Sequence, residues 1–166
     1  MIHRAAFSRN PAIGKPGAGK DVPEARLTDE LRVDPGFLPH LSLVAVDDDT
    51  VVGHVIATRG WIEPLGVPVL GLGPLGVSPA VQRHGIGSAL VHALLAVAEA
   101  ADERLVALLG APEYYRRFDF QTSTELGVAP PDATWGAHFQ ARQLGPFQAR
   151  GVFRYAAPFG GLQDGG

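Results

Sequence analysis

The sequence predicts a mixed α/β fold, and three features support this prediction. Two apolar runs flank an acidic turn, a long periodic helix follows a glycine-rich apolar segment, and more strand-like segments come after that helix. Hairpins combined with a helical crossover indicate a sheet with both antiparallel and parallel neighbours. At 166 residues, the chain is expected to form a single domain over 1–166.

The first half of the chain shows a loop, a helix and a hairpin. Residues 10–23 are rich in proline and glycine and predict a flexible loop, whereas 24–32 have helix-forming composition. The runs 41–46 and 51–58 read as paired strands, and Asp47-Asp48-Asp49 reads as the turn between them.

The centre of the chain is expected to contain an irregular strand. Residues 61–68 hold two prolines and predict a loop, and the apolar run 69–77 that follows contains three glycines and Pro74. Because proline cannot donate to a ladder, a bulge or splay is expected near Pro74, opening a wedge beside a strand at 104–109.

A helix is expected to begin at Gly85, because apolar residues recur on one face at helical spacing. These residues are Ile86, Leu90, Leu94, Val97 and Ala101. The remaining elements are expected to be a short helix at 112–117, strands at 120–128, 137–144 and 150–155, and a frayed tail at 160–166.

Composition narrows the function classes. The net charge is −3. The chain therefore lacks the basic excess that would indicate a nucleic-acid partner. The longest apolar run, 89–101, is interrupted by His92 and Glu99, so we expect no membrane span, and no apolar leader follows Met1. A cytoplasmic location is the default expectation. The absence of cysteine excludes disulfides and a cysteine acyl-enzyme, and no histidine spacing typical of a metal site occurs.

Two glycine-rich stretches imitate nucleotide-binding motifs. The stretch from Gly14 to Asp21 fits a P-loop until its last position, where Asp21 replaces the serine or threonine that holds magnesium. The stretch from Gly71 to Gly76 has the G-x-G-x-x-G spacing, but Val77-Ser78-Pro79 cannot open a helix there. A loop and a glycine-rich strand are therefore the favoured interpretations.

A third stretch, Gln82 to Ser88, stands immediately before the periodic helix. Helix-opening amides lack intrahelical partners and carry partial positive charge, so they can hold an anion such as a pyrophosphate. Gly85 and Gly87 would let the anion approach the backbone, and Arg83 could add a charge-assisted contact. From spacing alone, a glycine-softened helix start without a ligand is equally compatible.

The segment LGPLGVSPAVQRHGIGSALV resembles the signature strand, loop and helix of the GCN5-related N-acetyltransferases (GNAT). The matching positions are Leu75-Gly76-Val77, Pro79 and the Gln82-x-x-Gly85-x-Gly87 pattern. Together with the later GAPEYYRRFDF, the segment looks most like the YhbS-like branch of predicted N-acetyltransferases. The order of elements from about residue 24 to 144 is similar to that of the family.

The resemblance implies a fold with splayed central strands and acetyl-CoA as cosubstrate, without a metal. The pantetheine arm would bond the backbone of Leu75, Gly76 and Val77, as in strand addition, and a strand amide would stabilise the thioester oxyanion. The pyrophosphate would rest on a second set of residues. These are Arg83, His84, Gly85, Ile86, Gly87 and Ser88.

The resemblance also places Tyr115 at the position of the family's catalytic tyrosine, where a phenol protonates the departing CoA thiolate. Direct transfer to an amine of a small molecule or peptide is implied, and a homodimer is possible. Three departures stand out. The usual first strand is apparently lacking, Asp119 replaces a glycine and should adopt a left-handed conformation, and Leu108 replaces an asparagine that contacts CoA.

The general base remains open among His54, Glu63, Glu113 and a water chain. Two alternative functions also remain. One is a non-catalytic acyl-CoA-binding or regulatory module on the same fold, which the apparently missing first strand favours. The other is a nucleotide-binding protein that uses one of the two imitation motifs.

Overall fold

The structure is a computed structural model that describes residues 6–9 and 23–158. Within these residues, nine strands form one sheet, with the order β1-β2-β3-β4-β5-β8-β6 and with β9 pairing to β3 and β7. The strands are β1 (Ala6–Arg9), β2 (Phe37–Asp47), β3 (Thr50–Glu63), β4 (Val67–Val77), β5 (Leu105–Leu109), β6 (Gln121–Thr122), β7 (Val128–Ala129), β8 (Phe139–Gln143) and β9 (Gly151–Arg154).

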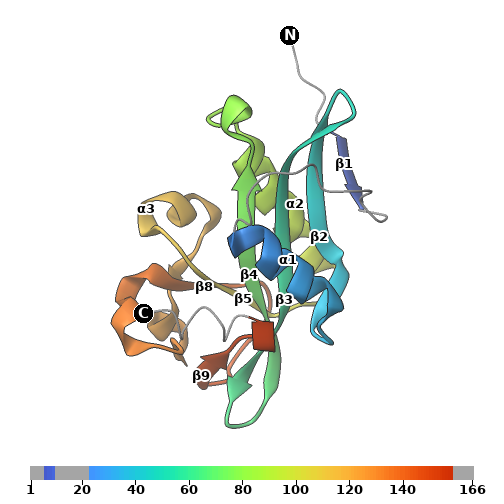
Figure 1. Cartoon of the computed structure of the whole chain (residues 1–166). Coiled ribbons are helices and arrows are strands. Elements are labelled where there is room, and N and C mark those ends of the chain that lie inside the picture. The colour runs from blue at the N-terminus through green and yellow to red at the C-terminus, as the bar shows by residue number, and fades with distance from the viewer. Residues whose placement is uncertain (1–5, 10–22, 159–166) are drawn as a thin grey trace.

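Three α-helices accompany this sheet in the described part of the chain: α1 (Pro23–Val33), α2 (Ile86–Ala100) and α3 (Pro112–Tyr115). Short 3-10 helices are η1 (Pro79–Val81), η2 (Arg116–Phe118), η3 (Ser123–Leu126) and η4 (Ala133–His138). Figure 1 shows α1 in front of the central strands and α2 behind them, so the two helices cover opposite faces. Both antiparallel and parallel pairs occur, which confirms the predicted mixed α/β sheet.

The core forms mainly between α2 and the sheet. The buried face of α2 consists of Leu90, Val91, Leu94, Leu95 and Ala98. These side chains join buried residues of β2, β3, β4 and β5 in one cluster. The helical face predicted from Ile86 to Val97 therefore points inward as expected, although its last member, Ala101, is exposed and follows the helix. The helical period of this segment is strong enough to place α2 without tertiary information.

The predicted irregularity of β4 is confirmed. Leu75 pairs with Val55 and Leu72 with Ala57, so Gly73 and Pro74 together oppose one residue of β3 and form a bulge. In the described residues, β4 and β5 pair at Leu70–Val106 and Gly71–Ala107 and not beyond. Since β5 continues to pair with β8 as far as Leu109, β4 and β5 diverge past Gly71.

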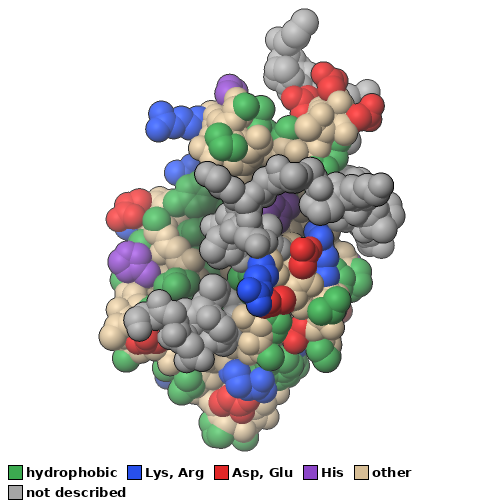
Figure 2. Space-filling view, in the orientation of Figure 1, with side chains coloured by type: hydrophobic (Ala, Val, Ile, Leu, Met, Phe, Trp, Pro, Cys, Tyr) green, Lys and Arg blue, Asp and Glu red, His purple; other side chains and the backbone are tan. Residues whose placement is uncertain are grey.

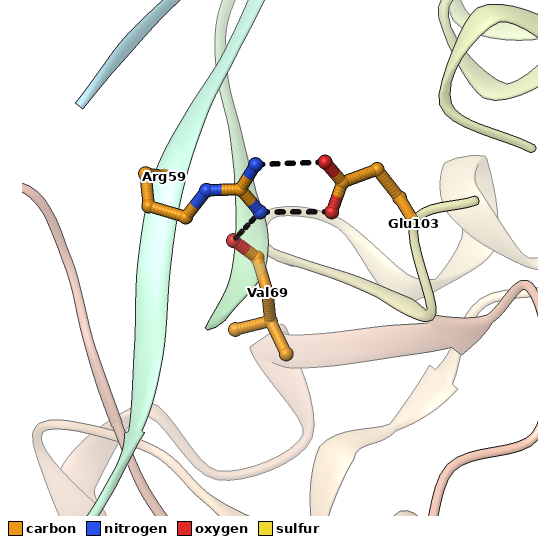
Figure 3. A network of polar contacts seen from close by, with 3 residues as sticks. All are labelled: Arg59, Val69 and Glu103. Carbon is orange, nitrogen blue, oxygen red and sulfur yellow. Dashed lines mark hydrogen bonds and ion pairs between the residues drawn. The ribbon is translucent and has the colours of Figure 1, made fainter. Parts of the chain in front are cut away.

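The closed end of this divergence is held by a partly buried ion pair. Arg59 on β3 donates two hydrogen bonds of 2.8 Å to the carboxylate of Glu103, which lies just before β5. The same guanidinium also donates to the carbonyl of Val69 on β4 at 3.3 Å. Figure 3 shows how one side chain thereby joins three segments at the end where β4 and β5 are still paired.

The expectation that the fold lacks its first strand is wrong. Ala6–Arg9 forms β1, which pairs antiparallel with Leu43–Val46 of β2 at the edge of the sheet. Four residues are too few to show a strand period, so only the pairing with β2 reveals the strand.

Two other boundaries differ from the prediction. The expected loop 61–68 is mostly strand: β3 extends to Glu63, β4 begins at Val67, and Trp61 pairs with Pro68. Pro68 is tolerated because β4 does not pair with β5 before Leu70 within the described chain. The expected strand 120–128 is divided into β6, η3 and β7, because the chain turns at Gly127, which has φ 77°.

Several other predicted elements are found in the structure, and three predicted segments lie outside the described residues. The helix 24–32, the hairpin 41–58, and the strands 104–109, 137–144 and 150–155 are confirmed with shifted ends. Asp119 has φ 61° and ψ 25°, which confirms the predicted left-handed conformation. The imitation P-loop, the loop 10–23 except its last residue and the tail 160–166 lie outside the described residues; Pro23 begins α1.

No helix in the described part of the chain is both long enough and apolar enough to cross a bilayer. On the face of the molecule that carries α1, positive and negative side chains are interspersed (Figure 2).

Candidate active site

A pocket of 540 Å³ lies where β4 leads into α2, and we call it the α2 pocket. It lies within the size range usual for small-molecule sites. Its lining comprises Leu75, Val77, Gln82, Arg83, Gly85, Ile86, Gly87, Ser88, Tyr114 and Arg117. Most of the residues that the sequence predicted for the cofactor therefore surround one cavity, although they come from β4, a loop and a helix.

The N-terminus of α2 faces this pocket without a capping group. Gly85 is the N-cap residue, its φ is 80°, and neither a capping side chain nor an acidic residue occurs in the first turn. The amides of Ile86, Gly87 and Ser88 precede the first intrahelical bond, from Ala89 N to Gly85 O, and thus lack helical acceptors. This end of the helix carries partial positive charge that an anion can neutralise.

The loop before α2 is fixed by two side chains. Gln82 donates from Nε2 to the carbonyl of Val77 at 3.1 Å, which ties the loop to the end of β4. His84 Nδ1 lies 3.0 Å from the carbonyl of Val81, so this nitrogen carries the proton. Arg83 and Gly85 both have positive φ, of 66° and 80°, which curls the backbone around the pocket.

His84 differs from the other predicted cofactor residues. Its side chain does not line the α2 pocket but an adjoining apolar groove, together with Val81 and Ile86. Only its backbone can belong to a phosphate cradle, because the bond to Val81 holds the ring on the other side of the loop. Gly76 is also absent from the pocket lining, and its neighbour is His54 on β3.

The glycines of the loop keep the backbone accessible. A Cβ atom at Gly87 would lie 3.0 Å from the Tyr114 hydroxyl oxygen, and a Cβ at Gly85 would meet nothing within 4 Å. The cradle is thus open at Gly85 and narrow at Gly87, where Tyr114 approaches from α3. A larger side chain at position 87 would fill the narrow space between the loop and Tyr114.

Tyr114 and Arg117 also line the pocket, and neither of them was identified from the sequence as a pocket residue. Arg117 donates from Nε to the carbonyl of Tyr114 at 3.0 Å, and its guanidinium carbon lies 4.7 Å from the centre of the Tyr114 ring. Their i, i+3 spacing, which places both on one side of a helical turn, could have indicated a shared surface.

Tyr115, the predicted catalytic residue, occupies a different position. Its ring packs against Gly110 so closely that a Cβ there would collide with it, and Tyr114 and Phe120 contact it edge-on at centroid distances of 4.9 and 5.8 Å. Burial, with a smaller contribution from Tyr114, raises the pKa of Tyr115 to about 12. The phenol therefore stays protonated at neutral pH, and its ring lies beside Gly110, which follows β5.

The three residues predicted as candidate general bases lie in different parts of the structure. Glu63 lies at the far end of β3, where Arg154 donates to it at 2.7 Å, away from the α2 pocket. Glu113 is exposed on α3 and does not line the pocket. His54 pairs with Gly76 on the signature strand. No group of three or more His, Asp or Glu residues suited to a metal ion occurs in the part of the chain that the structure describes.

Leu108, which stands where the resemblance implies an asparagine, is buried in the core with 1% of its surface exposed. The neighbouring carbonyl of Gly110 instead accepts a hydrogen bond of 3.0 Å from Gln140 on β8.

Comparisons with known proteins agree with this geometry. Residues 15–120 match the acetyltransferase (GNAT) family. The curated N-acetyltransferase YjhQ of Escherichia coli K12, itself described as uncharacterized, is 32% identical over 100 residues, covering 59% of this chain and 55% of that protein. The chain thus matches about half the length of this relative.

Two solved structures share the fold. YhbS of Escherichia coli, a GNAT family N-acetyltransferase in complex with CoA, is 26% identical with a TM-score of 0.76, covering 82% of this chain and 77% of that one. A GNAT family acetyltransferase of Brucella melitensis, in complex with acetyl-CoA, is 31% identical with a TM-score of 0.72, covering 95% and 99%. The resemblance noted in the sequence is thereby confirmed, and the chain belongs to the GNAT family of acetyltransferases.

Proposed function

We propose that the protein transfers an acetyl group from acetyl-CoA directly to an amine of a small molecule or peptide. The observation that carries the proposal is the uncapped N-terminus of α2, which opens into a pocket beside the point where β4 and β5 diverge. The complexes of the YhbS and Brucella proteins with CoA and acetyl-CoA support the choice of ligand.

In this proposal, the backbone from Arg83 to Ser88 holds the pyrophosphate. Charge-assisted hydrogen bonds from helix-opening amides are favourable for a dianion, and the glycines at 85 and 87 let it approach. Arg83 and Arg117 both line the pocket and would add positive charge to it. Backbone and arginine groups together support the assignment of the pyrophosphate to this loop.

The pantetheine arm would follow β4 along Leu75, Gly76 and Val77. Past Gly71, β5 no longer pairs with this edge in the described chain, so backbone groups of β4 are available to an added strand-like ligand. The bulge at Gly73 and Pro74 changes the direction of the strand at the point where the thioester would arrive. An amide there would stabilise the negative charge that develops on the thioester oxygen.

Tyr115 is proposed as the acid for the leaving thiolate. Its raised pKa, about 12, keeps the phenol protonated at neutral pH, so the hydroxyl still carries a proton when the thiolate departs. Its position against Gly110 puts the ring at the end of β5, beside the divergence, whereas Tyr114 lies nearer the pyrophosphate cradle. Because the chain has no cysteine, the acetyl group would pass straight to the amine.

The presence of β1 removes the observation that favoured a non-catalytic module, since the first strand of the fold is in place. Thermal unfolding with acetyl-CoA, ATP and NAD, followed by thiol release with a panel of amines, tests the proposal. We expect acetyl-CoA alone to raise the melting temperature, because a ligand selective for the folded state stabilises it. Stabilisation by ATP or NAD instead would contradict the assignment.

A further inference from the structure

The two faces of β3 lead to different sides of the molecule. A Cβ at Gly53 would lie 3.0 Å from Leu90 and 3.2 Å from Ile86, so Gly53 faces α2. Ile56 packs with leucines of α1. Successive side chains of a strand alternate between faces, so His54 lies on the α1 face with Ile56. Figure 1 shows that this face is the front of the sheet, opposite α2.

His54 touches the strand to which the cofactor arm is assigned. It pairs across the sheet with Gly76, and a Cβ at Gly76 would lie 2.9 Å from His54 Cε1 and 3.3 Å from Nδ1. The imidazole therefore lies against the backbone of residue 76, where only glycine leaves room for it. A cavity of 270 Å³ adjoins both residues and continues to Val77 and Ser78.

The proposed cofactor site lies on one face of the sheet, and we assign the acceptor to the other face. The α2 pocket is lined by residues of α2 and α3, and the aromatic side chains of α3 belong to the same core cluster as α2. A cofactor in that pocket occupies the α2 face, which leaves the α1 face for the amine. His54 is a titratable residue of β3 that lies on this face, directly opposite Gly76 of the signature strand.

Across the sheet, His54 pairs with Val44 on β2 and with Gly76 on β4. Four charged side chains of α1 form two ion pairs with one another. These pairs are Arg26–Glu30 and Arg32–Asp29. Histidine ordinarily changes charge between about pH 5 and 8, which suits a group that must accept a proton near neutral pH.

Resting on the proposed function, we propose that His54 is the general base for the acceptor amine. It takes one proton from the ammonium, and the freed nitrogen lone pair forms the N–C bond to the acetyl carbon. The C–S bond then breaks, and the thiolate takes the Tyr115 proton. The new amide nitrogen must lose a second proton, and this proton passes through solvent to the Tyr115 phenolate and restores the phenol. The proton on His54 passes to solvent. One proton is released in each turnover.

The test compares two amines that differ in their need for a base. Benzylamine is an ammonium ion at neutral pH, whereas methoxyamine is already neutral. The variant is His54→Gln, and the matched control is His92→Gln, an exposed histidine on α2. Thiol release from acetyl-CoA is measured with each amine and with water alone, from pH 5 to 10, after acetyl-CoA binding has been verified by thermal shift.

For His54→Gln we expect the benzylamine rate to fall by about 10²–10⁴-fold and the methoxyamine rate by less than about tenfold. The parent rate with benzylamine should rise between about pH 5 and 8, and the variant should lose this rise. His92→Gln should behave as the parent. Equal losses with both amines, or an unchanged pH profile, would overturn the assignment and point to a structural role.

The parent protein also decides the question if His54→Gln fails to fold. A benzylamine rate that does not rise over the histidine range contradicts a base at His54, while acetyl-CoA turnover as such would leave the proposed function intact. A parent that binds acetyl-CoA but releases no thiol with either amine or water contradicts the transferase function itself and overturns this inference with it.

Discussion

Arg59 and Glu103 form a bidentate ion pair with two hydrogen bonds of 2.8 Å, between residues 44 positions apart in the chain. Their side chains are 22% and 11% exposed, and the pair lies where β4 and β5 are still paired (Figure 3). The divergence that the cofactor arm would enter therefore starts from a closed end that this pair fixes.

Replacement of Glu103 by Leu should lower the free energy of unfolding by about 2–4 kcal/mol, because the Arg59 charge is left without its partner. Denaturant unfolding measures the change. The double variant Arg59→Met/Glu103→Leu should recover most of the loss. The exposed pair Arg154–Glu63 provides the matched control, since Glu63→Leu should cost about 0–1 kcal/mol. Equal losses at the two pairs would contradict the role given to burial.

Gly87→Leu should weaken acetyl-CoA binding by about 100-fold or more, since the new side chain fills the cradle and removes charge-assisted hydrogen bonds. The helix itself should not suffer, because leucine favours a helix more than glycine does. Isothermal titration calorimetry gives the affinity. Ala96→Leu, on the exposed side of the same helix, should leave it unchanged. Variants of Gly85 would be harder to interpret, because φ is 80° at this position and other residues adopt this conformation only with strain.

Tyr115→Phe should lower kcat by about 10²–10⁴-fold with little change in acetyl-CoA affinity, because it removes the acid and keeps the packing. Tyr114→Phe should instead raise the KM for acetyl-CoA by roughly fivefold, since its hydroxyl lies at the cradle beside Gly87. Steady-state kinetics on one amine separate the two outcomes. A kcat defect in Tyr114→Phe alone would transfer the acid role to Tyr114.

Tyr115 should also make the fold sensitive to alkali. Its pKa is about 12 in the folded protein against an ordinary value of 10, so the unfolded chain loses this proton first as the pH rises. The contribution of this group to the free energy of unfolding is fully present below pH 10. It is lost as the pH rises through 12, and the loss is on the order of 2–3 kcal/mol. Urea unfolding of Tyr115→Phe, compared with the parent at pH 8 and 11, should show a smaller loss. Parallel losses in both proteins would argue against a buried phenol.

The sequence predicted those features that depend on local chemistry. Pro74 lacks an amide proton, so a break in the ladder could be expected, and the bulge lies at Gly73 and Pro74. The helical period from Ile86 onward placed α2, and Asp119 tolerates the left-handed conformation that it adopts. In each case the constraint lies within a few residues.

Features set by distant contacts could not be predicted. The strand at Ala6–Arg9 exists through its pairing with β2, and the pair Arg59–Glu103 requires knowledge of which segments meet. Tyr114 lines the α2 pocket and Tyr115 does not, and this difference depends on the direction of a four-residue helix, which adjacent positions in a sequence do not reveal. The face of His54 likewise follows from the contacts of Gly53 and Ile56 with different helices.

Backbone amide NMR during addition of CoA tests the central claim most directly, because the cradle is made of backbone groups. We predict that the largest shifts of the ¹⁵N–¹H signals occur from Arg83 to Ser88, with smaller shifts at Leu75 to Val77. In Gly87→Leu, these shifts should disappear at the same CoA concentration. Binding of CoA that leaves the amides of 83–88 unperturbed would contradict the account.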